Sequence, residues 1–509
     1  MRWYAALTGI TTLAGLLVAA PATAAPARSS MDIDGDGKDE LVAGAYLGTE
    51  GYGIVVTYSR LARRDRFALP SGAGQIGSQF GQPLTSGDFN ADGYADLVVG
   101  DPEERLAAGP SYSAGGLWVF SGGPSGLNLS QPLHLNQDTA GMPGAMESYD
   151  WFGGALAAGD LNGDGRDDLA VSARGDKVNG HALAGSVTVL FGSAAGLTTA
   201  GAQLATQDTP GVPGAIESSD GFGVGLAVGD MTRDGYADLA VGAPRDGDWS
   251  EPYEHGTITL LRGSASGVSE TGATSVTGVE LGIGSIGHTM SIADIDGDGD
   301  GDLVAGAPRQ DIGYLVYIPG VAGGLDVPQA RIISMNTPGV PGTPRPYLPE
   351  EPSHLGFGHS VATGDVTGDG RADVLTSARG HEVNGQEYAG AIFLIPGTAS
   401  GLTGAGSLML TQHRQGPLRP GRAVPSCQQP GRWDFFGDAN AILNLDGSGA
   451  LDMVTASKWE NFSNGMVMRV GFQHAARRTA SGRLVRVPVA LATTSCQSDP
   501  GVGHSLLHQ

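Results

Sequence analysis

The sequence predicts an all-β fold, a seven-bladed β-propeller in which every blade is a four-stranded antiparallel sheet. An acidic motif of the form Asp-x-Asp-x-Asp-Gly-x-x-Asp, with some variation, recurs seven times at a spacing of roughly seventy residues, which indicates a repeat architecture. Each copy runs into short β-branched segments bounded by glycine, as strands do. With 84 glycines, 6% aromatic residues and no long window of 3.6-residue apolar periodicity, almost no helix is expected after the N-terminal segment.

Each repeat contains the same parts in the same order. A Phe-Gly pair such as Phe152-Gly153 precedes the acidic motif by eight residues, with Ile286-Gly287 as a variant. Gly-Ala-Pro or a related triplet follows, as at 242–244, and a glycine then opens an apolar strand, as at 185–190. A Gly/Ser-rich turn leads into a weaker fourth strand. Four strands repeated radially are typical of a propeller, where only short sheet edges remain.

The chain begins with a basic residue, an apolar run over 5–20 and an Ala22-Thr-Ala24 site. This order is typical of a secretory signal peptide cleaved near Ala24 or Ala25. The run is shorter than the roughly 18–20 residues that span a membrane, so a secreted protein without a transmembrane segment is expected. The expected divisions are a signal peptide at 1–25, a propeller at 26–496 with blades at roughly 26–75, 76–147, 148–217, 218–281, 282–352, 353–431 and 432–496, and a C-terminal tail at 497–509.

The acidic motifs are candidate calcium loops, because a hard cation binds six to eight oxygens that alternate residues of a tight loop can supply. The alternative is a solvated acidic turn, which seven regular copies disfavour. The candidate ligands at loop positions 1, 3, 5 and 9 are Asp32, Asp34, Asp36 and Glu40; Asp88, Asn90, Asp92 and Asp96; Asp160, Asn162, Asp164 and Asp168; Asp230, Thr232, Asp234 and Asp238; Asp294, Asp296, Asp298 and Asp302; and Asp365, Thr367, Asp369 and Asp373.

The seventh loop, with Asn444, Asp446, Ser448 and Asp452, is poor in charge, so about six Ca²⁺ ions with a structural role are expected. Position 7 varies freely between loops and is expected to offer only its backbone carbonyl. An EF-hand is excluded, because that loop needs a Glu at position 12 and flanking helices, whereas position 12 here is Val171 or its equivalent within a strand-like run.

The Phe-Gly pair, the acidic loop and Gly-Ala-Pro together resemble FG-GAP repeats, those of integrin α-subunit N-terminal propellers and of bacterial exported proteins. The resemblance covers residues from about 30 to 495 and implies a calcium-binding propeller. Blade 1 departs from the pattern, since it lacks Phe-Gly and residues 26–31 make a poor inner strand. The strand-like segment 483–491 is then either the outer strand of blade 7 or a strand that pairs with blade 1 to close the ring.

The net charge of −24 argues against nucleic acid as a partner, because phosphate binding needs a basic surface. The two cysteines, Cys427 and Cys496, are expected to form a disulfide in an exported chain, with two free thiols as the alternative.

Aromatic residues gather on loops expected at the face opposite the acidic motifs. Exposed aromatics on loops of a rigid scaffold are typical of binding surfaces, although each ring could instead cover the base of its own loop. The candidate ligand-face residues are Tyr149, Trp151, Trp249, Tyr253, Trp433 and Trp459. The triplet Arg174-Gly175-Asp176 is interpreted as ordinary loop variation, because blade 6 carries Arg379-Gly380-His381 at the same point.

The sequence contains no His-Glu-x-x-His, no Gly-x-Ser-x-Gly and no phosphate-binding loop. The first hypothesis is therefore a secreted, monomeric, calcium-binding propeller that binds an extracellular protein or glycan, as in adhesion. The alternative is an exported phospholipase- or esterase-like hydrolase, because related propellers accompany phospholipase domains; a passive surface protein is a third possibility.

Overall fold

The computed structural model describes residues 31–45, 54–59, 62–68, 79–105, 112–247, 256–308, 312–344, 356–411, 435–445, 447, 449–460, 464–478, 484–498 and 505–506, and the predicted signal peptide lies outside them. Within these ranges no helix has both the length and the apolar character needed to cross a membrane.

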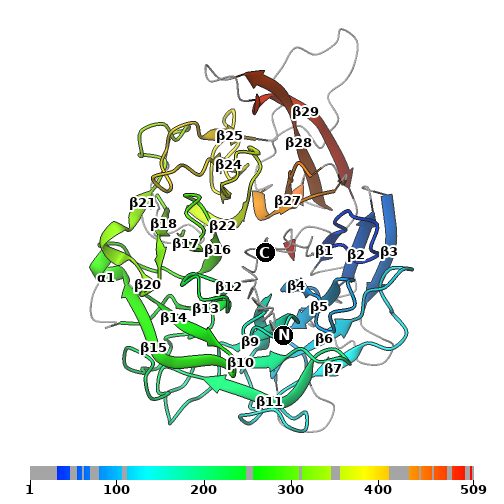
Figure 1. Cartoon of the computed structure of the whole chain (residues 1–509), viewed down its shortest axis with the longest axis vertical. Helices are drawn as coiled ribbons and strands as arrows, with labels where there is room; N and C mark the ends of the chain where they lie inside the picture. The colour runs from blue at the N-terminus through cyan, green and yellow to red at the C-terminus, as the bar shows by residue number, and fades with distance from the viewer. Residues whose placement is uncertain are drawn as a thin grey trace, which may run out of the picture.

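The described residues form seven four-stranded antiparallel sheets and one two-stranded sheet, and the seven larger sheets stand as blades around a central axis (Figure 1). The prediction of an all-β, seven-bladed propeller is confirmed. From the first blade to the seventh, the strands are β1 (Leu41–Ala45), β2 (Ile54–Ser59), β3 (Ala62–Ala68) and β30 (Ser505–Leu506); β4 (Leu84–Gly87), β5 (Asp96–Asp101), β6 (Gly116–Phe120) and β7 (Leu133–Leu135); β8 (Phe152–Gly159), β9 (Asp168–Ala173), β10 (Ser186–Phe191) and β11 (Thr198–Ala205); β12 (Gly225–Gly229), β13 (Asp238–Ala243), β14 (Thr257–Ser264) and β15 (Gly267–Thr277); β16 (Thr289–Ala293), β17 (Asp302–Ala307), β18 (Tyr314–Ile318) and β21 (Arg331–Ile333); β22 (Phe357–Gly364), β23 (Asp373–Ala378), β24 (Ala391–Ile395) and β25 (Leu408–Leu410); β26 (Phe436–Leu443), β27 (Asp452–Glu460), β28 (Asn464–Arg478) and β29 (Leu484–Ser498).

Helix is nearly absent from these ranges, as the lack of 3.6-residue periodicity predicts. The described helices are α1 (Gly278–Leu281) and the 3₁₀ turn η1 (Val327–Gln329). The small sheet pairs β19 (Gly320–Val321) with β20 (Gly324–Leu325) in the turn before the outer strand of blade 5.

The second strand of each blade is buried on both faces, because neighbouring blades cover it from either side. All six residues of β9 and of β13 are buried, which explains why these strands are apolar or small throughout rather than alternating. Side chains of adjacent blades therefore form one layer of core between each pair of sheets, and every blade depends on its neighbours for burial.

The aromatic residues of the Phe-Gly pairs are among the largest fully buried side chains in the described part of the chain. Phe222 is fully buried and packs with Val187 and Val189, which belong to the preceding blade. Phe152 likewise packs against Leu117 of blade 2. Truncation of a buried Phe to Ala lowers the free energy of unfolding by roughly 3–5 kcal/mol, so each Phe stabilises the contact between its blade and the preceding one.

The glycine that opens the third strand allows this close approach. Gly185 has φ +88°, and a Cβ at this position would lie 2.3 Å from the carbonyl oxygen of Phe222. The Phe222 amide donates to the carbonyl of Ala184 at 2.8 Å, and Phe152 makes the equivalent bond to Ala114 at 2.9 Å. Adjacent blades are therefore joined backbone to backbone at this point.

The ring closes through a strand from each end of the described chain. β30 pairs antiparallel with β1, with Ala43 opposite Leu506 and Gly44 opposite Ser505, and so supplies the innermost strand that residues 26–31 were expected to make poorly. β29 pairs with β28 as the outer strand of blade 7, which settles the choice left open for the segment 483–491. The segment 497–509, expected to be a tail, thus contributes to the ring at 505–506.

Candidate metal centres

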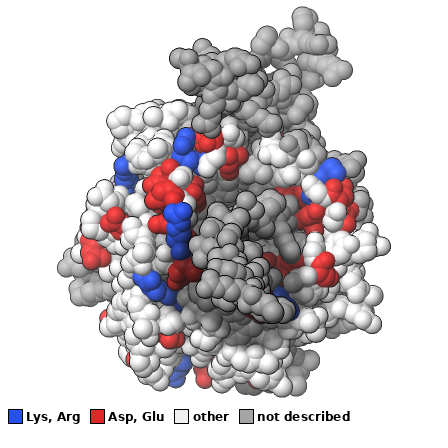
Figure 2. Space-filling model, viewed as in Figure 1, with Lys and Arg blue, Asp and Glu red and all other residues white. Residues whose placement is uncertain are grey.

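In blades 2 to 7 the acidic loop connects the first and second strands, and in blade 1 it precedes β1. In blade 3, β8 ends at Gly159, the loop follows from Asp160, and β9 begins at Asp168. The same placement holds in blades 2, 4, 5 and 6, so these loops all lie at one end of the strands. In the view of Figure 2, acidic side chains form separate patches around the ring, some with a basic side chain beside them.

The loop backbone is folded onto its own carboxylates. Asp160 accepts from the Asp164 amide through Oδ1 at 3.0 Å and from the Gly165 amide through Oδ2 at 2.9 Å. Asn162 Oδ1 also accepts from Asp164, and Asp164 Oδ1 accepts from Arg166, both at 2.9 Å. The side chains at positions 1, 3 and 5 therefore converge inside the turn, where a cation would be bound.

Position 9 is the buried end of each loop. Asp168 is fully buried, and its two oxygens accept from the amides of Leu161 at 3.1 Å and Gly192 at 2.9 Å. The second bond fixes the loop to the turn that follows β10. Burial, reinforced by the charges of Asp160 and Asp164, raises the pKa of Asp168 to about 7.

The equivalent carboxylates share this environment. Burial is the first cause in each case and neighbouring loop carboxylates add to it, with the pKa raised to about 7 for Glu40 and Asp96 and to about 6 for Asp238, Asp302 and Asp373. A bound cation would offset this concentration of negative charge.

Two loops gather three carboxylates tightly enough to hold an ion. One oxygen from each of Asp32, Asp34 and Asp36 lies within 4.8 Å of the others, and Asp294, Asp296 and Asp302 form a second such group. In loop 4 the position-3 hydroxyl, Thr232 Oγ1, is buried without a hydrogen-bond partner. Acidic groups that could bind a metal are therefore present, and the all-oxygen donor set fits a hard cation such as calcium.

The side chain at position 7, expected to be unimportant, takes part in the loop. Lys38 Nζ lies 3.0 Å from Asp36 Oδ2, Arg166 Nη1 lies 3.2 Å from Asp164 Oδ2, and Arg371 forms the equivalent ion pair in blade 6. These basic groups offset part of the charge on position 5. Position 7 is basic in three loops and tyrosine in two, a pattern from which a role for this side chain is predictable.

The tyrosines at position 7 act on the neighbouring loop instead. A Cβ on Gly163 would lie 2.7 Å from Tyr236 Cε1, and a Cβ on Gly35 would lie 2.7 Å from Tyr94 Cε1. Each ring thus lies against the position-4 glycine of the loop before it. Loop 4 reaches in the other direction, where Arg233 Nη1 donates to the carbonyl of Asp298 at 2.8 Å.

A repeated backbone bond joins consecutive loops. The amide at position 8 of one loop donates to the carbonyl at position 1 of the loop in the preceding blade. The six bonds are Asp39 to Asn444, 3.0 Å; Ala95 to Asp32, 3.0 Å; Asp167 to Asp88, 3.2 Å; Ala237 to Asp160, 3.1 Å; Gly301 to Asp230, 2.8 Å; and Ala372 to Asp294, 2.8 Å. The loops are therefore connected to one another along the face of the ring.

The seventh loop is described only in part. Asp446 and Ser448 lie outside the described residues, and the Asn444 side-chain oxygen is buried without a partner. Position 2 is a further feature that sequence reasoning missed. It is apolar and buried in every loop, as Leu161 and Ile295 illustrate, and it anchors the turn in the core.

The expected ligand face lies at the end of the strands opposite the acidic loops, and the structure describes part of it. Tyr149 and Tyr112 are 50% and 56% exposed, and their rings stack at a centroid distance of 6.4 Å. Trp151 lies edge-on to Tyr149 at 6.2 Å, and the Arg174 guanidinium lies 5.0 Å from the Trp151 ring centroid. Tyr112 and Arg174 were not among the predicted ligand-face residues, although both lie on loops at this end.

The structure does not describe the side chains of the remaining candidates on this face. Trp249, Tyr253 and Trp433 lie outside the described residues, and for Trp459 only the strand is described. The same holds for the predicted disulfide, since Cys427 lies outside the described residues and Cys496 is placed only by its pairing in β29.

The Arg-Gly-Asp triplet belongs to the packing of its own loop. The Gly175 amide donates to the carbonyl of Asp150 at 3.0 Å, and Asp176 Oδ2 accepts from the Ser186 hydroxyl at 2.6 Å. With Arg174 against Trp151, the triplet packs against the crossing that precedes β8 and against β10, in line with the interpretation as loop variation.

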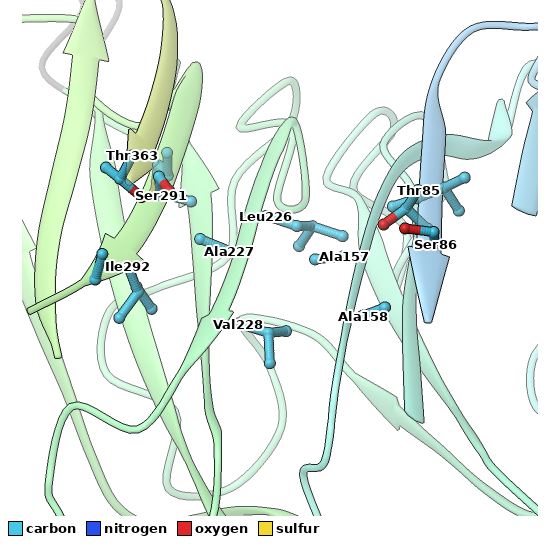
Figure 3. Close-up of a pocket in the computed structure, with 13 residues that line it drawn as sticks. Thr85, Ser86, Ala157, Ala158, Leu226, Ala227, Val228, Ser291, Ile292 and Thr363 are labelled. Atoms are coloured by element: carbon cyan, nitrogen blue, oxygen red, sulfur yellow. Dashed lines mark hydrogen bonds between the residues drawn. The ribbon is translucent and has the colours of Figure 1, made fainter. Parts of the chain in front are cut away.

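A cavity of about 300 Å³ lies on the axis between the innermost strands (Figure 3). Small residues such as Ala157 and Ala227 leave this space, and Ser291 and Thr363 share a hydrogen bond of 2.8 Å at its edge. None of the described residues that line the cavity is ionisable, and its polar side chains are hydroxyls.

The FG-GAP repeat pattern matches residues 80–120, 152–190, 222–261, 287–323 and 357–395, one segment in each of blades 2 to 6. Phosphatidylinositol-glycan-specific phospholipase D of Rattus norvegicus is 34% identical over 160 residues, covering 31% of this chain and 19% of that protein. Integrin alpha-7 of Homo sapiens is 30% identical over 256 residues, covering 50% of this chain and 19% of that protein. The chain spans about a fifth of the length of these curated relatives.

Among solved structures, rhamnogalacturonan lyase YesW aligns with a TM-score of 0.34 and 13% identity over 72% of this chain and 65% of that chain, a likeness that carries no functional argument. The repeated Phe-Gly pairs, the acidic loops between first and second strands and the five matched segments lead to one conclusion. The chain is an FG-GAP repeat protein related to integrin α subunits and to phosphatidylinositol-glycan-specific phospholipase D over part of their length.

Proposed function

We propose that this chain is a secreted calcium-binding propeller whose loop-rich face, opposite the acidic loops, binds an extracellular protein or glycan. The observation that carries the calcium assignment is the convergence of carboxylate oxygens within 4.8 Å in loops 1 and 5, on a loop frame that recurs from blade to blade. About six Ca²⁺ ions, one in each of the first six loops, would hold these carboxylates together. Because the unfolded chain lacks such sites, calcium binding stabilises the folded ring.

Calcium removal tests the first part of the proposal. The full chain is expected to melt at a lower temperature and to be cleaved faster by protease in excess chelator than in calcium. Asp160→Ala, which removes two loop acceptors and one ligand, is expected to reduce the number of bound ions by one. Ser130→Ala, in the turn before β7, is the matched control and is expected to bind as many ions as the wild type. An unchanged melting temperature in chelator would contradict the structural role of calcium.

The stacked aromatics support the binding face. Tyr112 and Tyr149 expose half of their side-chain surface at the end of the strands remote from the acidic loops, where they are held on a rigid scaffold. Exposed aromatic rings on loops are enriched at recognition surfaces, and their stacking fixes the orientation in which a partner would meet them. A monomeric propeller presents this surface once per molecule.

Binding to arrays of immobilised glycans and extracellular proteins, in the presence of calcium, tests this face. Tyr112→Ala with Tyr149→Ala is expected to lose any binding that the wild type shows. Val321→Ala alters an exposed residue in the turn after the third strand of blade 5, at the end of the acidic loops, and is expected to bind as the wild type does. Binding that survives the double substitution and is lost in the control would place the partner on the other face.

A hydrolase is the second candidate, favoured by the similarity to phosphatidylinositol-glycan-specific phospholipase D. That similarity covers 19% of the relative, and the sequence contains neither Gly-x-Ser-x-Gly nor His-Glu-x-x-His. Incubation of the full chain with phospholipid, glycan-linked phospholipid and ester substrates tests the idea. Substrate hydrolysis that co-purifies with the chain and is abolished by substitution of a single residue would support a hydrolase.

A further inference from the structure

Three acidic side chains meet at the junction of blades 3 and 4, away from the calcium loops. Glu217 and Asp220 lie on the crossing from β11 to β12, and Asp246 follows β13. One oxygen of each lies within 4.8 Å of the other two. Since the crossing enters β12 at the end opposite the acidic loop 230–238, this cluster belongs to the face that carries Tyr149.

Buried polar atoms without partners adjoin the cluster. Asp220 is fully buried; its Oδ2 accepts from the Glu217 amide at 2.7 Å, while its Oδ1 has no hydrogen-bond partner. Gln207 is 4% exposed, its Nε2 lies 3.2 Å from Asp246 Oδ2, and its Oε1 is buried without a partner. Buried oxygens are rarely left unpaired in folded proteins, so the Asp220 orphan, which lies in the cluster itself, indicates a missing ligand.

A cation bound among the three carboxylates would satisfy Asp220 Oδ1. Rotation of the Gln207 amide by a half-turn about its last bond exchanges its oxygen and nitrogen, and the carbonyl oxygen then faces Asp246. Three carboxylates and one amide oxygen make an all-oxygen donor set, with room for water on the exposed side of Glu217. Such a set is typical of calcium, which accepts carboxylate, amide and water oxygens with flexible geometry.

We propose that Glu217, Asp220 and Asp246, with the Gln207 amide, form a further divalent-cation site for calcium that fastens the blade 3 to blade 4 crossing onto the loop after β13. The site is separate from the acidic loops in position and in pattern, since its ligands come from two loops far apart in the sequence. Calcium here would order the face on which the exposed aromatics lie.

The chain contains its own matched control. Blade 3 carries the same residue types at the same points, with Gln137, Glu147, Asp150 and Asp176 in the corresponding positions. In the described part of the chain these acids do not form a group within 4.8 Å, and Asp176 Oδ2 is held by the Ser186 hydroxyl at 2.6 Å. The twin junction therefore shares the sequence pattern and lacks the geometry.

Equilibrium dialysis of the full chain against increasing free calcium, with bound calcium counted per chain, tests the site. Asp220→Asn combined with Asp246→Asn is expected to bind one ion fewer than the wild type, while Asp150→Asn combined with Asp176→Asn is expected to keep the full count. An unchanged count in the first variant, with the fold verified by circular dichroism, would overturn the proposal. Loss of the proposed ion can be distinguished from loss of an ion in the acidic loops, because Asp160→Ala is expected to remove an ion from loop 3.

Should the double variant fail to fold, Glu217→Gln replaces an exposed side chain and leaves the core intact. It is expected to lose one equivalent at calcium concentrations that saturate the wild type. Hydrogen exchange of the segment 206–224 gives a local readout, with slower exchange in calcium for the wild type and no slowing for Glu217→Gln. Exchange that follows pH and not calcium would show that a shared proton holds the cluster, and the cation site would then be wrong.

Discussion

Buried carboxylates at the loop junctions give single residues a large effect on stability. Asp150 is 1% exposed, and its Oδ2 accepts from the Glu147 amide at 2.5 Å. Burial raises the pKa of Asp150 to about 6, and the charges of Asp176 and Glu147 add to the increase. The folded state therefore retains a proton on Asp150 at pH values where the unfolded chain has released it.

The sign of the effect on stability follows from proton binding. Between about pH 4 and pH 6 the folded state binds more protons than the unfolded state, so the contribution of Asp150 is complete below that interval and is lost as the pH rises through it. Asp150→Asn is expected to flatten this part of the stability profile and to raise stability near neutral pH. Denaturant unfolding of both proteins from pH 4 to pH 8, in calcium, gives the comparison; parallel profiles would show that Asp150 titrates normally.

Gly185 is the second residue with a specific expectation. Ala at this position would combine a positive φ with a contact of 2.3 Å to the Phe222 carbonyl, so the two blades would have to separate. Gly185→Ala is expected to cost about 3 kcal/mol or more. Gly196 has φ +95° and open space around its Cβ position, so Gly196→Ala is expected to cost only about 1–2 kcal/mol. Equal losses in chemical denaturation would contradict the close approach at Gly185.

At the scale of elements, the acidic loops act as a connected series. Tyr236 of loop 4 lies against Gly163 of loop 3, and the Ala237 amide donates to the Asp160 carbonyl in the same pair of loops. A change in one loop should therefore reach the next one.

Tyr236→Ala tests this connection. Removal of the ring is expected to destabilise the chain by about 1–2 kcal/mol, less than the roughly 3–5 kcal/mol for a fully buried aromatic, because Tyr236 is only partly buried. It is also expected to weaken calcium binding at loop 3, to which Tyr236 contributes no ligand. Tyr236→Phe keeps the ring and should behave as the wild type. The variant Asp160→Ala identifies the ion bound by loop 3. If Tyr236→Ala weakens calcium binding at loop 4 and leaves the loop 3 ion unchanged, the loops bind calcium independently.

The sequence predicted the repeated elements well, because their signals are local. Glycine at loop positions 4 and 6, acids at alternate positions and the following β-branched run are readable from a single stretch such as 160–171. Contacts between the loops of adjacent blades could not be predicted from the sequence. The contact of Tyr236 with Gly163 and the hydrogen bond from Arg233 to the Asp298 carbonyl depend on how neighbouring loops face one another, and a single loop sequence carries no pattern for that.

The acid cluster of Glu217, Asp220 and Asp246 was missed for a related reason. Its members are separated in the sequence, and the same residue types in blade 3 are not gathered in the same way. Similarly, the pairing of Ser505 and Leu506 with β1 involves two residues without strand composition beyond them. Register in that pair is determined by the geometry of the ring and not by local preference.

At the scale of the whole molecule, the ring closes where blade 7 meets blade 1, through a shared core in which Val42 clusters with Val454 and through backbone pairing. β30 contributes two paired residues to blade 1, and on the side of the acidic loops Asp39 joins Asn444 through two bonds: its amide donates to the Asn444 carbonyl at 3.0 Å, and its carboxylate accepts from the Asn444 amide at 2.5 Å. The junction of blades 7 and 1 is therefore the point at which strain or truncation should open the ring.

A chain ending at Ser498 is expected to melt at a lower temperature than the full chain and to be cleaved by protease first in blade 1, because β1 loses its inner partner. A chain ending at Leu506 retains β30 and serves as the control, with melting expected near that of the full chain. Identical melting and cleavage of the two truncated chains would show that β30 does not contribute to closure.

The pairing of β30 with β1 also orders events in time. Blade 1 is synthesised before blades 2 to 7, yet its innermost strand follows blade 7 in the chain. During synthesis the inner edge of β1 therefore lacks β30 until six further blades have emerged, a state in which it is open to chaperones and to mispairing with other chains. The ring is complete only when Ser505 and Leu506 have paired with β1.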